Sequence, residues 1–155
     1  MVPDGRRSDA EIYAEYATEL VRFATGIVGP VDAADVVAEA FARLLCTSVW
    51  HDATNHRALL YRRVWYDANS WTRANHRRRR REARAVQEPT IEFPDLNPEI
   101  SRAVQQLSPQ QRAVVFLTYW NDLTPGAVAE LLDVSEGTVR KQLARARDHL
   151  RRVLA

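Results

Sequence analysis

Arginine supplies nearly all the positive charge of this 155-residue chain, and it gathers in two stretches that could bind nucleic acid. The first stretch, 136–154, has apolar residues at three- and four-residue spacing with cations between them, which predicts a helix with one core face and one cationic face. Residues near the start of such a helix reach base edges in the major groove, and cations further along reach phosphate. The candidate DNA contacts are Ser135, Glu136, Thr138, Arg140, Lys141 and Arg145.

The second stretch, 56–81, mixes arginines with flat aromatic rings. Cations follow phosphates and rings stack on unpaired bases at roughly 1 to 3 kcal/mol each, which is the chemistry that single-stranded nucleic acid requires. The preceding segment, 47–55, lacks periodicity and is predicted to be a loop. A structural role explains some of these aromatics as core residues. The candidate contacts are Trp50, His51, Arg62, Arg63, Trp65, Tyr66, Arg73, Arg77 and Arg78.

No group of residues in the sequence indicates catalysis, a metal site or a cofactor. The four histidines lie on different predicted elements, no glycine-rich loop is present to hold phosphate, and Ser, His and Asp do not group as a nucleophile requires. The single cysteine, Cys46, excludes an internal disulfide, and its simplest role is that of a small core residue. We therefore expect a protein that is not an enzyme and that binds no metal or cofactor.

The elements around the first stretch predict a helix-turn-helix. Ser108, Pro109 and Gln111 form a start signal for one helix, Thr124 and Pro125 start a second over 125–132, and Ser135 starts the third. A short helix, a tight turn and a longer basic helix is the arrangement that places the last helix in the major groove. The alternative is a solvated amphipathic pair whose arginines only keep the chain soluble.

The N-terminal half is predicted to be helical as well. Ser8 and Glu11 start a helix that Gly29 and Pro30 end, and a second helix begins at Asp32 with Val36, Val37, Ala40, Phe41 and Leu44 as its buried stripe. A long helix over 56–81 follows, with Leu59, Leu60, Val64, Ala68 and Trp71 as its inner stripe. The second helix also carries a charged face, formed by Asp32, Asp35, Glu39 and Arg43.

These patterns predict an all-α chain of two small helical domains, 8–84 and 98–155. The segment between them, 85–97, has no lysine or arginine, is acidic and contains proline, so we expect a linker. No stretch approaches the roughly 18 apolar residues that a membrane span requires, and the N-terminus does not read as a signal sequence. We therefore expect a cytoplasmic protein with no membrane association.

The C-terminal motifs resemble region 4 of bacterial sigma-70 family factors, in particular the extracytoplasmic-function (ECF) group. The resemblance lies in the run from Leu107 to Trp120 and in Gly137-Thr-Val-Arg followed by Leu143-Ala-Arg-Ala-Arg147. Response regulators of the LuxR type share a weaker version of the second motif. In the sigma family, this region reads the −35 promoter element and contacts the flap of the second-largest polymerase subunit, so the resemblance implies both roles for 98–155.

The N-terminal half resembles region 2 of the same group. Residues 32–45 are similar to region 2.2, which implies docking of the Asp32, Asp35, Glu39 and Arg43 face on the clamp helices of the largest RNA polymerase subunit. Residues 60–65 and the arginine run 77–81 are similar to regions 2.3 and 2.4, which implies melting and reading of the −10 element. Ala38, Tyr66 and Asp67 depart from the family pattern in this region. For the linker 85–97, the resemblance implies a path through the polymerase active-site cleft.

The sequence leaves two other functions open. A stand-alone DNA-binding regulator would use only the C-terminal half, and a sigma-like decoy would bind polymerase without directing initiation. An ECF sigma factor that binds core RNA polymerase and promoter DNA is the prediction, and an anti-sigma factor is a further candidate partner.

Overall fold

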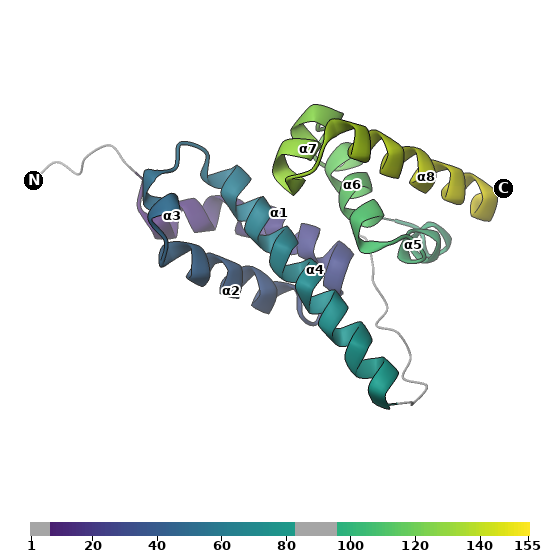
Figure 1. Cartoon of the computed structure of the whole chain (residues 1–155), viewed down its shortest axis with the longest axis horizontal. Helices are drawn as coiled ribbons and strands as arrows, with labels where there is room; N and C mark the ends of the chain where they lie inside the picture. The colour runs from purple at the N-terminus through teal and green to yellow at the C-terminus, as the bar shows by residue number, and fades with distance from the viewer. Residues whose placement is uncertain (1–6, 83–95) are drawn as a thin grey trace, which may run out of the picture.

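The computed structural model describes residues 7–82 and 96–155, and these form eight α-helices and no strand (Figure 1). The all-α prediction is confirmed, whereas most of the expected linker lies outside the described residues. The N-terminal half contains α1 (Asp9–Val28), α2 (Ala33–Leu45), α3 (Ser48–Asp52) and α4 (His56–Glu82). The C-terminal half contains α5 (Pro98–Gln105), α6 (Pro109–Tyr119), α7 (Pro125–Leu132) and α8 (Glu136–Leu154).

Short polar side chains start several helices where the sequence predicts them. The Ser8 hydroxyl accepts a hydrogen bond from the backbone N–H of Glu11 at 3.2 Å and starts α1. Ser108 and Gln111 form a complete capping box at the start of α6, in which each side chain accepts from the other residue's backbone N–H at 3.2 Å. Asp32 precedes α2 as predicted, but its side chain makes no cap hydrogen bond.

The prediction of a loop over 47–55 is wrong, because residues 48–52 form α3. Trp50 is fully buried, and its Nε1 donates to the Asp9 carboxylate at 2.9 Å. Its ring meets the rings of Phe41 and His56 edge-on, at centroid distances of 5.5 and 4.4 Å. An indole that has both apolar neighbours and a partner for its N–H is stable in a core, so this segment folds inward as a short helix.

The inner stripe of α4 differs from the predicted one, because Leu59 and Trp71 are only half-buried. Leu60, Val64 and Ala68 are fully buried as expected, and Trp65 is buried with them at 8% exposure.

The prediction that Cys46 is a small core residue is wrong, because Cys46 lies exposed at the end of α2.

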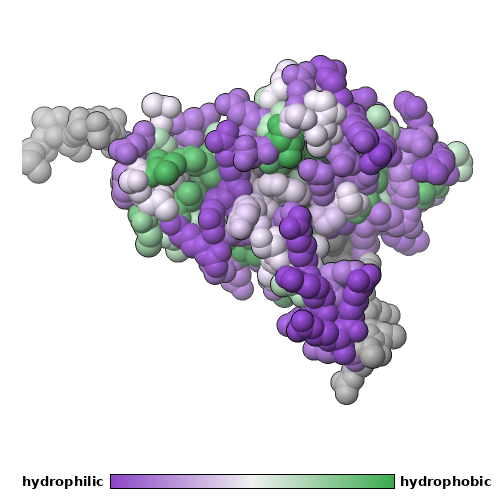
Figure 2. Space-filling model, in the orientation of Figure 1, coloured by the Kyte–Doolittle hydropathy of each residue, from purple (hydrophilic) through white to green (hydrophobic). Residues whose placement is uncertain are grey.

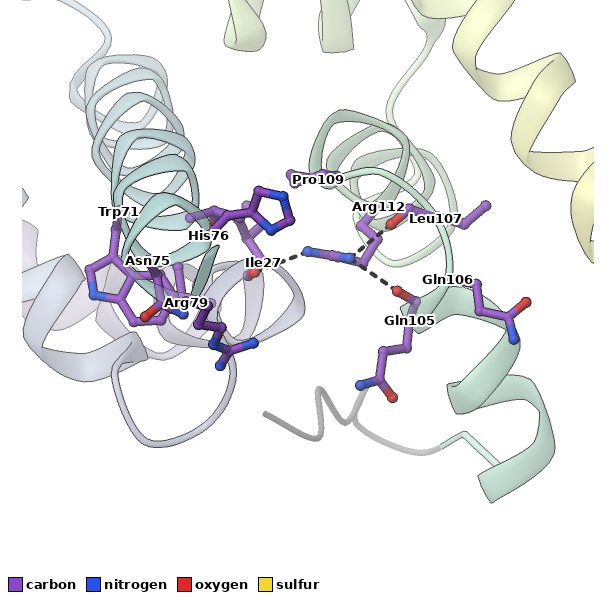
Figure 3. A pocket seen from close by; sticks show the side chains of 12 residues that line it. Ile27, Trp71, Asn75, His76, Arg79, Gln105, Gln106, Leu107, Pro109 and Arg112 are labelled. Carbon is purple, nitrogen blue, oxygen red and sulfur yellow. Dashed lines mark hydrogen bonds between the residues drawn. The ribbon is translucent and has the colours of Figure 1, made fainter. Parts of the chain in front are cut away.

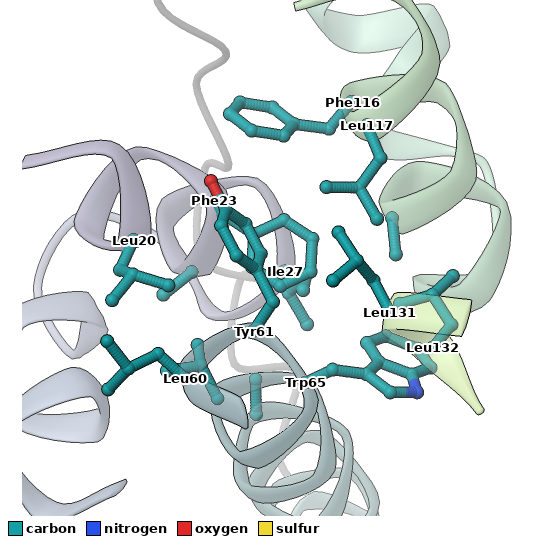
Figure 4. Packing of buried hydrophobic residues seen from close by; sticks show 14 of the residues in the cluster. Leu20, Phe23, Ile27, Leu60, Tyr61, Trp65, Phe116, Leu117, Leu131 and Leu132 are labelled. Carbon is teal, nitrogen blue, oxygen red and sulfur yellow. The ribbon is translucent and has the colours of Figure 1, made fainter. Parts of the chain in front are cut away.

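The two halves pack against each other along α1, α4, α6 and α7, and their buried residues form one continuous cluster. Figure 4 shows Phe23 and Tyr61 facing Phe116 across this seam, with Trp65 directed toward Leu132. The ring centroids of Phe23 lie 5.2 Å from Tyr61 and 5.6 Å from Phe116, both tilted. Burial of these large side chains, at about 1.5 to 3 kcal/mol each, makes the seam part of the core.

Arg112 ties the seam together, and it is the one charged residue that is buried in the described part of the chain, at 6% exposure. Its Nε and Nη2 donate to the carbonyl oxygens of Gly26 and Ile27, in the last turn of α1, at 2.8 and 3.1 Å. Its Nη1 donates to the carbonyl oxygen of Gln105, the last residue of α5, at 3.2 Å and to that of Leu107, just beyond the helix, at 2.8 Å (Figure 3). A cation placed at two helix C-termini satisfies carbonyls that helices leave without partners and complements their dipoles.

We predict that Arg112→Met lowers the free energy of unfolding by about 3 kcal/mol, because methionine retains apolar volume but leaves buried carbonyl oxygens without their charged donor. Urea titration, with the midpoint and the slope both fitted, measures the change. The matched control is Arg102→Met, since Arg102 is exposed on α5 and its loss should change the free energy by less than about 0.5 kcal/mol. Equal midpoints for the two variants would contradict this role of Arg112.

Candidate nucleic-acid interface

The candidate −35 contacts lie together at the start of α8. Ser135, Glu136, Arg140, Lys141 and Arg145 are exposed, and Thr138 is half-buried. The backbone N–H of Thr138 donates to the Ser135 hydroxyl at 3.1 Å, which fixes the first turn of the helix. Glu136 and Arg140 form an ion pair one turn apart, in which Nε and Nη2 of Arg140 donate to one carboxylate oxygen at 3.1 and 2.7 Å.

The helix-turn-helix scaffold holds α8 in place from two sides. Val139, Leu143 and Ala146 are buried against the apolar faces of α6 and α7. Gln142 adds polar contacts, because its amide nitrogen donates to Gln110 at 3.1 Å and its oxygen accepts from Gln111 at 3.2 Å. These glutamine contacts link the start of α6 to the middle of α8 and so determine which side chains α8 presents outward.

The turn between α7 and α8 depends on a left-handed residue, Asp133, with φ 55° and ψ 49°. Aspartate is one of the few residues that adopt this conformation at modest cost. The break that the sequence predicts at 133–135 is therefore confirmed, and it reverses the chain sharply enough to pack α7 on α8.

The second half of α4 forms a basic projection at the edge of the molecule. Arg73, Arg77 and Arg78 are exposed there, and Tyr66 is 63% exposed nearer the middle of the helix. Figure 2 shows this end of α4 as a continuous hydrophilic surface. Of the candidate −10 contacts, these four are accessible along their helix, and their charge and single ring suit a nucleic-acid backbone and an unpaired base.

The candidate −10 contacts Trp50 and His51 lie apart from the third, Tyr66. Trp50 is buried and His51 is exposed, and both line a pocket of about 720 Å³ beside α3, together with Arg7 and Asp52. Tyr66 lines different pockets, between α2 and α4 and against α7. The prediction that Trp50 stacks on a base is therefore wrong for this structure, since its ring is already enclosed by protein.

The C-terminal half covers two further candidate contacts on α4. Nε of Arg62 donates to the carbonyl oxygen of Glu130 in α7 at 2.8 Å, and Trp65 packs beside Leu132 (Figure 4). In this arrangement, Trp65 has no exposed ring face to offer to a base. Because α7 covers the ring, a −10 contact by Trp65 remains a prediction that requires α7 to move away.

The charged face of α2 lies on the surface as the sequence predicts. Asp35, Glu39 and Arg43 are exposed and Asp32 is half-buried. Nη2 of Arg43 donates to Glu39 at 2.6 Å, and its Nη1 lies 3.3 Å from Asp67 of α4. The sequence pattern did not suggest the contact with Asp67, because the two residues are 24 positions apart.

A partly buried polar network joins α1, α4 and the segment after α6. The hydroxyl of Tyr61 donates to Glu19 at 2.8 Å and accepts from the side-chain amide of Asn121 at 2.9 Å. Nε of Arg57 donates to the same Glu19 oxygen at 2.7 Å. Burial raises the pKa of Tyr61, and the Glu19 carboxylate raises it further, so the hydroxyl remains protonated and able to donate.

Within the described ranges 7–82 and 96–155, no group of three or more His, Cys, Asp or Glu side chains could hold a metal ion. The same residues contain no helix that is long and apolar enough to span a membrane.

Comparisons with known proteins fit this arrangement of helices. The family model for sigma-70 region 4 matches residues 98–150. The RNA polymerase sigma-E factor of Streptomyces antibioticus is 32% identical over 160 residues, which cover 93% of this chain and 83% of that protein. The chain belongs to the sigma-70 family of RNA polymerase sigma factors, in the ECF group. This sigma factor directs transcription initiation.

A solved structure has the same fold as this sigma factor. The sigma factor RpoE of Bartonella quintana, in complex with the anti-sigma factor NepR, superposes with a TM-score of 0.74 at 18% identity. The match covers 94% of this chain and 95% of that one.

We predict that Arg140→Ala changes which −35 sequences are accepted, because a bidentate contact of arginine with guanine contributes about 1 to 3 kcal/mol of discrimination. Arg145→Ala should weaken binding to all promoters about equally and lower the dependence of binding on salt. The reason is that Arg145 lies more than a turn further along α8, where we expect it to contact a phosphate. Glu136→Gln tests whether the ion pair orients Arg140, and it should broaden the consensus.

The measurement is selection from a randomised −35 library with each holoenzyme, followed by salt titration on the selected sites. An unchanged consensus with Arg140→Ala would make Arg140 a backbone contact and assign specificity to DNA shape.

Proposed function

We propose that this sigma factor binds core RNA polymerase through the Asp35 and Glu39 face of α2 and reads promoters with two separate surfaces. The start of α8 reads the −35 element as duplex, and the basic projection of α4 reads the −10 element as a single strand. The functional units are 8–84 and 98–155, joined by the linker 85–97. The protein acts in the cytoplasm and has no catalytic activity of its own.

One observation carries the proposal: a single chain presents an exposed recognition helix in one half and an exposed basic helix with an accessible ring in the other. Duplex readout requires a rigid helix that enters the major groove, and α8 is held by α6 and α7. Single-strand readout requires cations beside a stacking surface, which Arg73, Arg77 and Tyr66 supply. A stand-alone regulator would need only the first of these surfaces.

The proposal requires the two halves to separate on a promoter. The elements are named for positions about 35 and 10 base pairs upstream, so at about 3.4 Å per base pair they lie about 85 Å apart. The longest helix, α4, has 27 residues and therefore spans only about 40 Å. Because Arg62 of α4 touches Glu130 of α7, the packed arrangement cannot reach both elements. Separation would also uncover Arg62 and Trp65 for DNA.

An anti-sigma factor is a second candidate partner. The structure of similar fold is that of RpoE bound to NepR. A partner that contacts both halves would keep them together and so block promoter binding.

Run-off transcription with purified core polymerase and a promoter library tests the proposal. The expected result is transcripts that depend on this chain and share a −35 and a −10 motif upstream of their starts. A stand-alone regulator would bind DNA without core enzyme and yield no new starts. A decoy would bind core enzyme and yield none either, so co-elution with core enzyme distinguishes the two failures.

We predict that Asp35→Arg with Glu39→Arg abolishes co-elution with core polymerase, since reversing two charges at an interface turns attraction into repulsion. Both side chains are exposed, so the fold should be retained. The matched control is Glu11→Arg with Glu15→Arg, which makes the same charge change at the same spacing on the exposed side of α1. Co-elution of the α2 double variant at the level of the control would place the polymerase contact elsewhere.

A further inference from the structure

We propose that Asp67 is a positioning residue that holds Arg63 away from the DNA backbone and against Tyr66, and that it thereby favours the correct −10 strand over other DNA. The inference rests on the proposed function of α4. By the resemblance described above, Asp67 is one of three residues, with Ala38 and Tyr66, at which this chain departs from the sigma-family pattern in region 2.

Asp67 binds two arginines from two helices. Nη1 of Arg43, from α2, lies 3.3 Å from its carboxylate, and Nη2 of Arg63, from α4, lies 3.0 Å away. Nε of Arg63 donates to the second carboxylate oxygen at 3.2 Å. The Asp67 side chain is only 9% exposed, so these charged partners compensate a carboxylate that is largely removed from water.

The two arginines differ in what holds them besides Asp67. Arg43 also donates to Glu39 at 2.6 Å, so it keeps an acidic partner on its own helix. The guanidinium of Arg63 lies over the ring of Tyr66, 5.3 Å from its centroid. Within the described part of the chain, Asp67 is the carboxylate that pairs with Arg63. Loss of the Asp67 charge therefore releases Arg63 far more than Arg43.

Tethering Arg63 has two consequences for DNA binding. An arginine paired with a carboxylate contributes little to the sequence-independent attraction of phosphates, so Asp67 lowers the affinity for DNA of any sequence. The same pair orders the guanidinium and with it the exposed Tyr66 ring, beside the pocket of about 360 Å³ between α2 and α4. An ordered ring at the mouth of a pocket can distinguish unpaired bases better than a mobile one, because less conformational entropy is lost on binding.

The test is a double-mutant cycle of Asp67→Asn and Arg63→Gln in the holoenzyme. Affinity for duplex DNA without a promoter is measured against salt, and run-off transcription is measured from templates with the selected or an altered −10 element. Asparagine has the shape of aspartate, and circular dichroism checks that each variant is folded.

In Asp67→Asn we expect the slope of log affinity against log salt concentration to steepen by about 0.9, the value for one added phosphate contact. The preference for the selected −10 element should fall about fivefold or more, the lower end of what one base contact contributes. In the double variant, Arg63→Gln should remove the salt dependence that Asp67→Asn adds. In the parent background, Arg63→Gln alone should change the salt dependence by less than about half of that 0.9. If Asp67→Asn does not fold, Arg63→Gln alone still decides, because a loss of about 0.9 there would mean that Arg63 already contacts phosphate.

Unchanged salt dependence and unchanged −10 preference in a folded Asp67→Asn would overturn the proposal. If the parent holoenzyme itself shows no −10 preference, the proposed function of α4 fails instead. The two failures are therefore distinguishable in one set of templates.

Discussion

The structure depends on a cation buried between two helix ends. Arg112 reaches from α6 to carbonyl oxygens in the last turn of α1 and to those at the end of α5 and just beyond it. One side chain therefore joins the two halves and fixes the segment between α5 and α6. The rings of Phe23 and Phe116 pack against each other across the seam, and α7 packs on α4. A guanidinium suits this position because its several donors lie in one plane and it remains charged when buried.

Much of the fold follows from local rules, and what does not follow involves contacts between distant residues. The caps at Ser8, Ser108 and Ser135 and the break at Asp133 are local chemistry, and the sequence predicts each of them. The burial of Trp50 depends on Asp9, 41 positions earlier, and that of Trp65 depends on α7. Periodicity within one helix cannot reveal such partners. A cation that directly precedes an apolar run, as Arg112 precedes 113–117, is the one local signal that could have indicated a buried arginine.

The seam creates a conflict between stability and function. The apolar contacts of Trp65 and Leu132 and the hydrogen bonds of Arg62 and Asn121 stabilise the packed arrangement, yet the same surfaces of α4 are candidates for promoter DNA. A protein in this state keeps part of its single-strand surface covered until partners that bind the separated halves more tightly shift the population. The exposed parts of both surfaces, at Arg77 and at Arg140, remain available for the first contacts.

The separation of the two halves on a promoter is the central claim of this account, and energy transfer between dyes on the two halves measures it directly. Cysteines at Ser70 on α4 and Ala144 on α8, both exposed, accept the dyes once the native Cys46 is replaced by serine. Transfer should be efficient in the free protein. In the complex with core polymerase and promoter it should fall almost to zero, as the labels move toward the separation of about 85 Å that the two elements impose. Efficient transfer retained in a complex that transcribes would contradict the account, because the packed arrangement would then be the one that reads promoters.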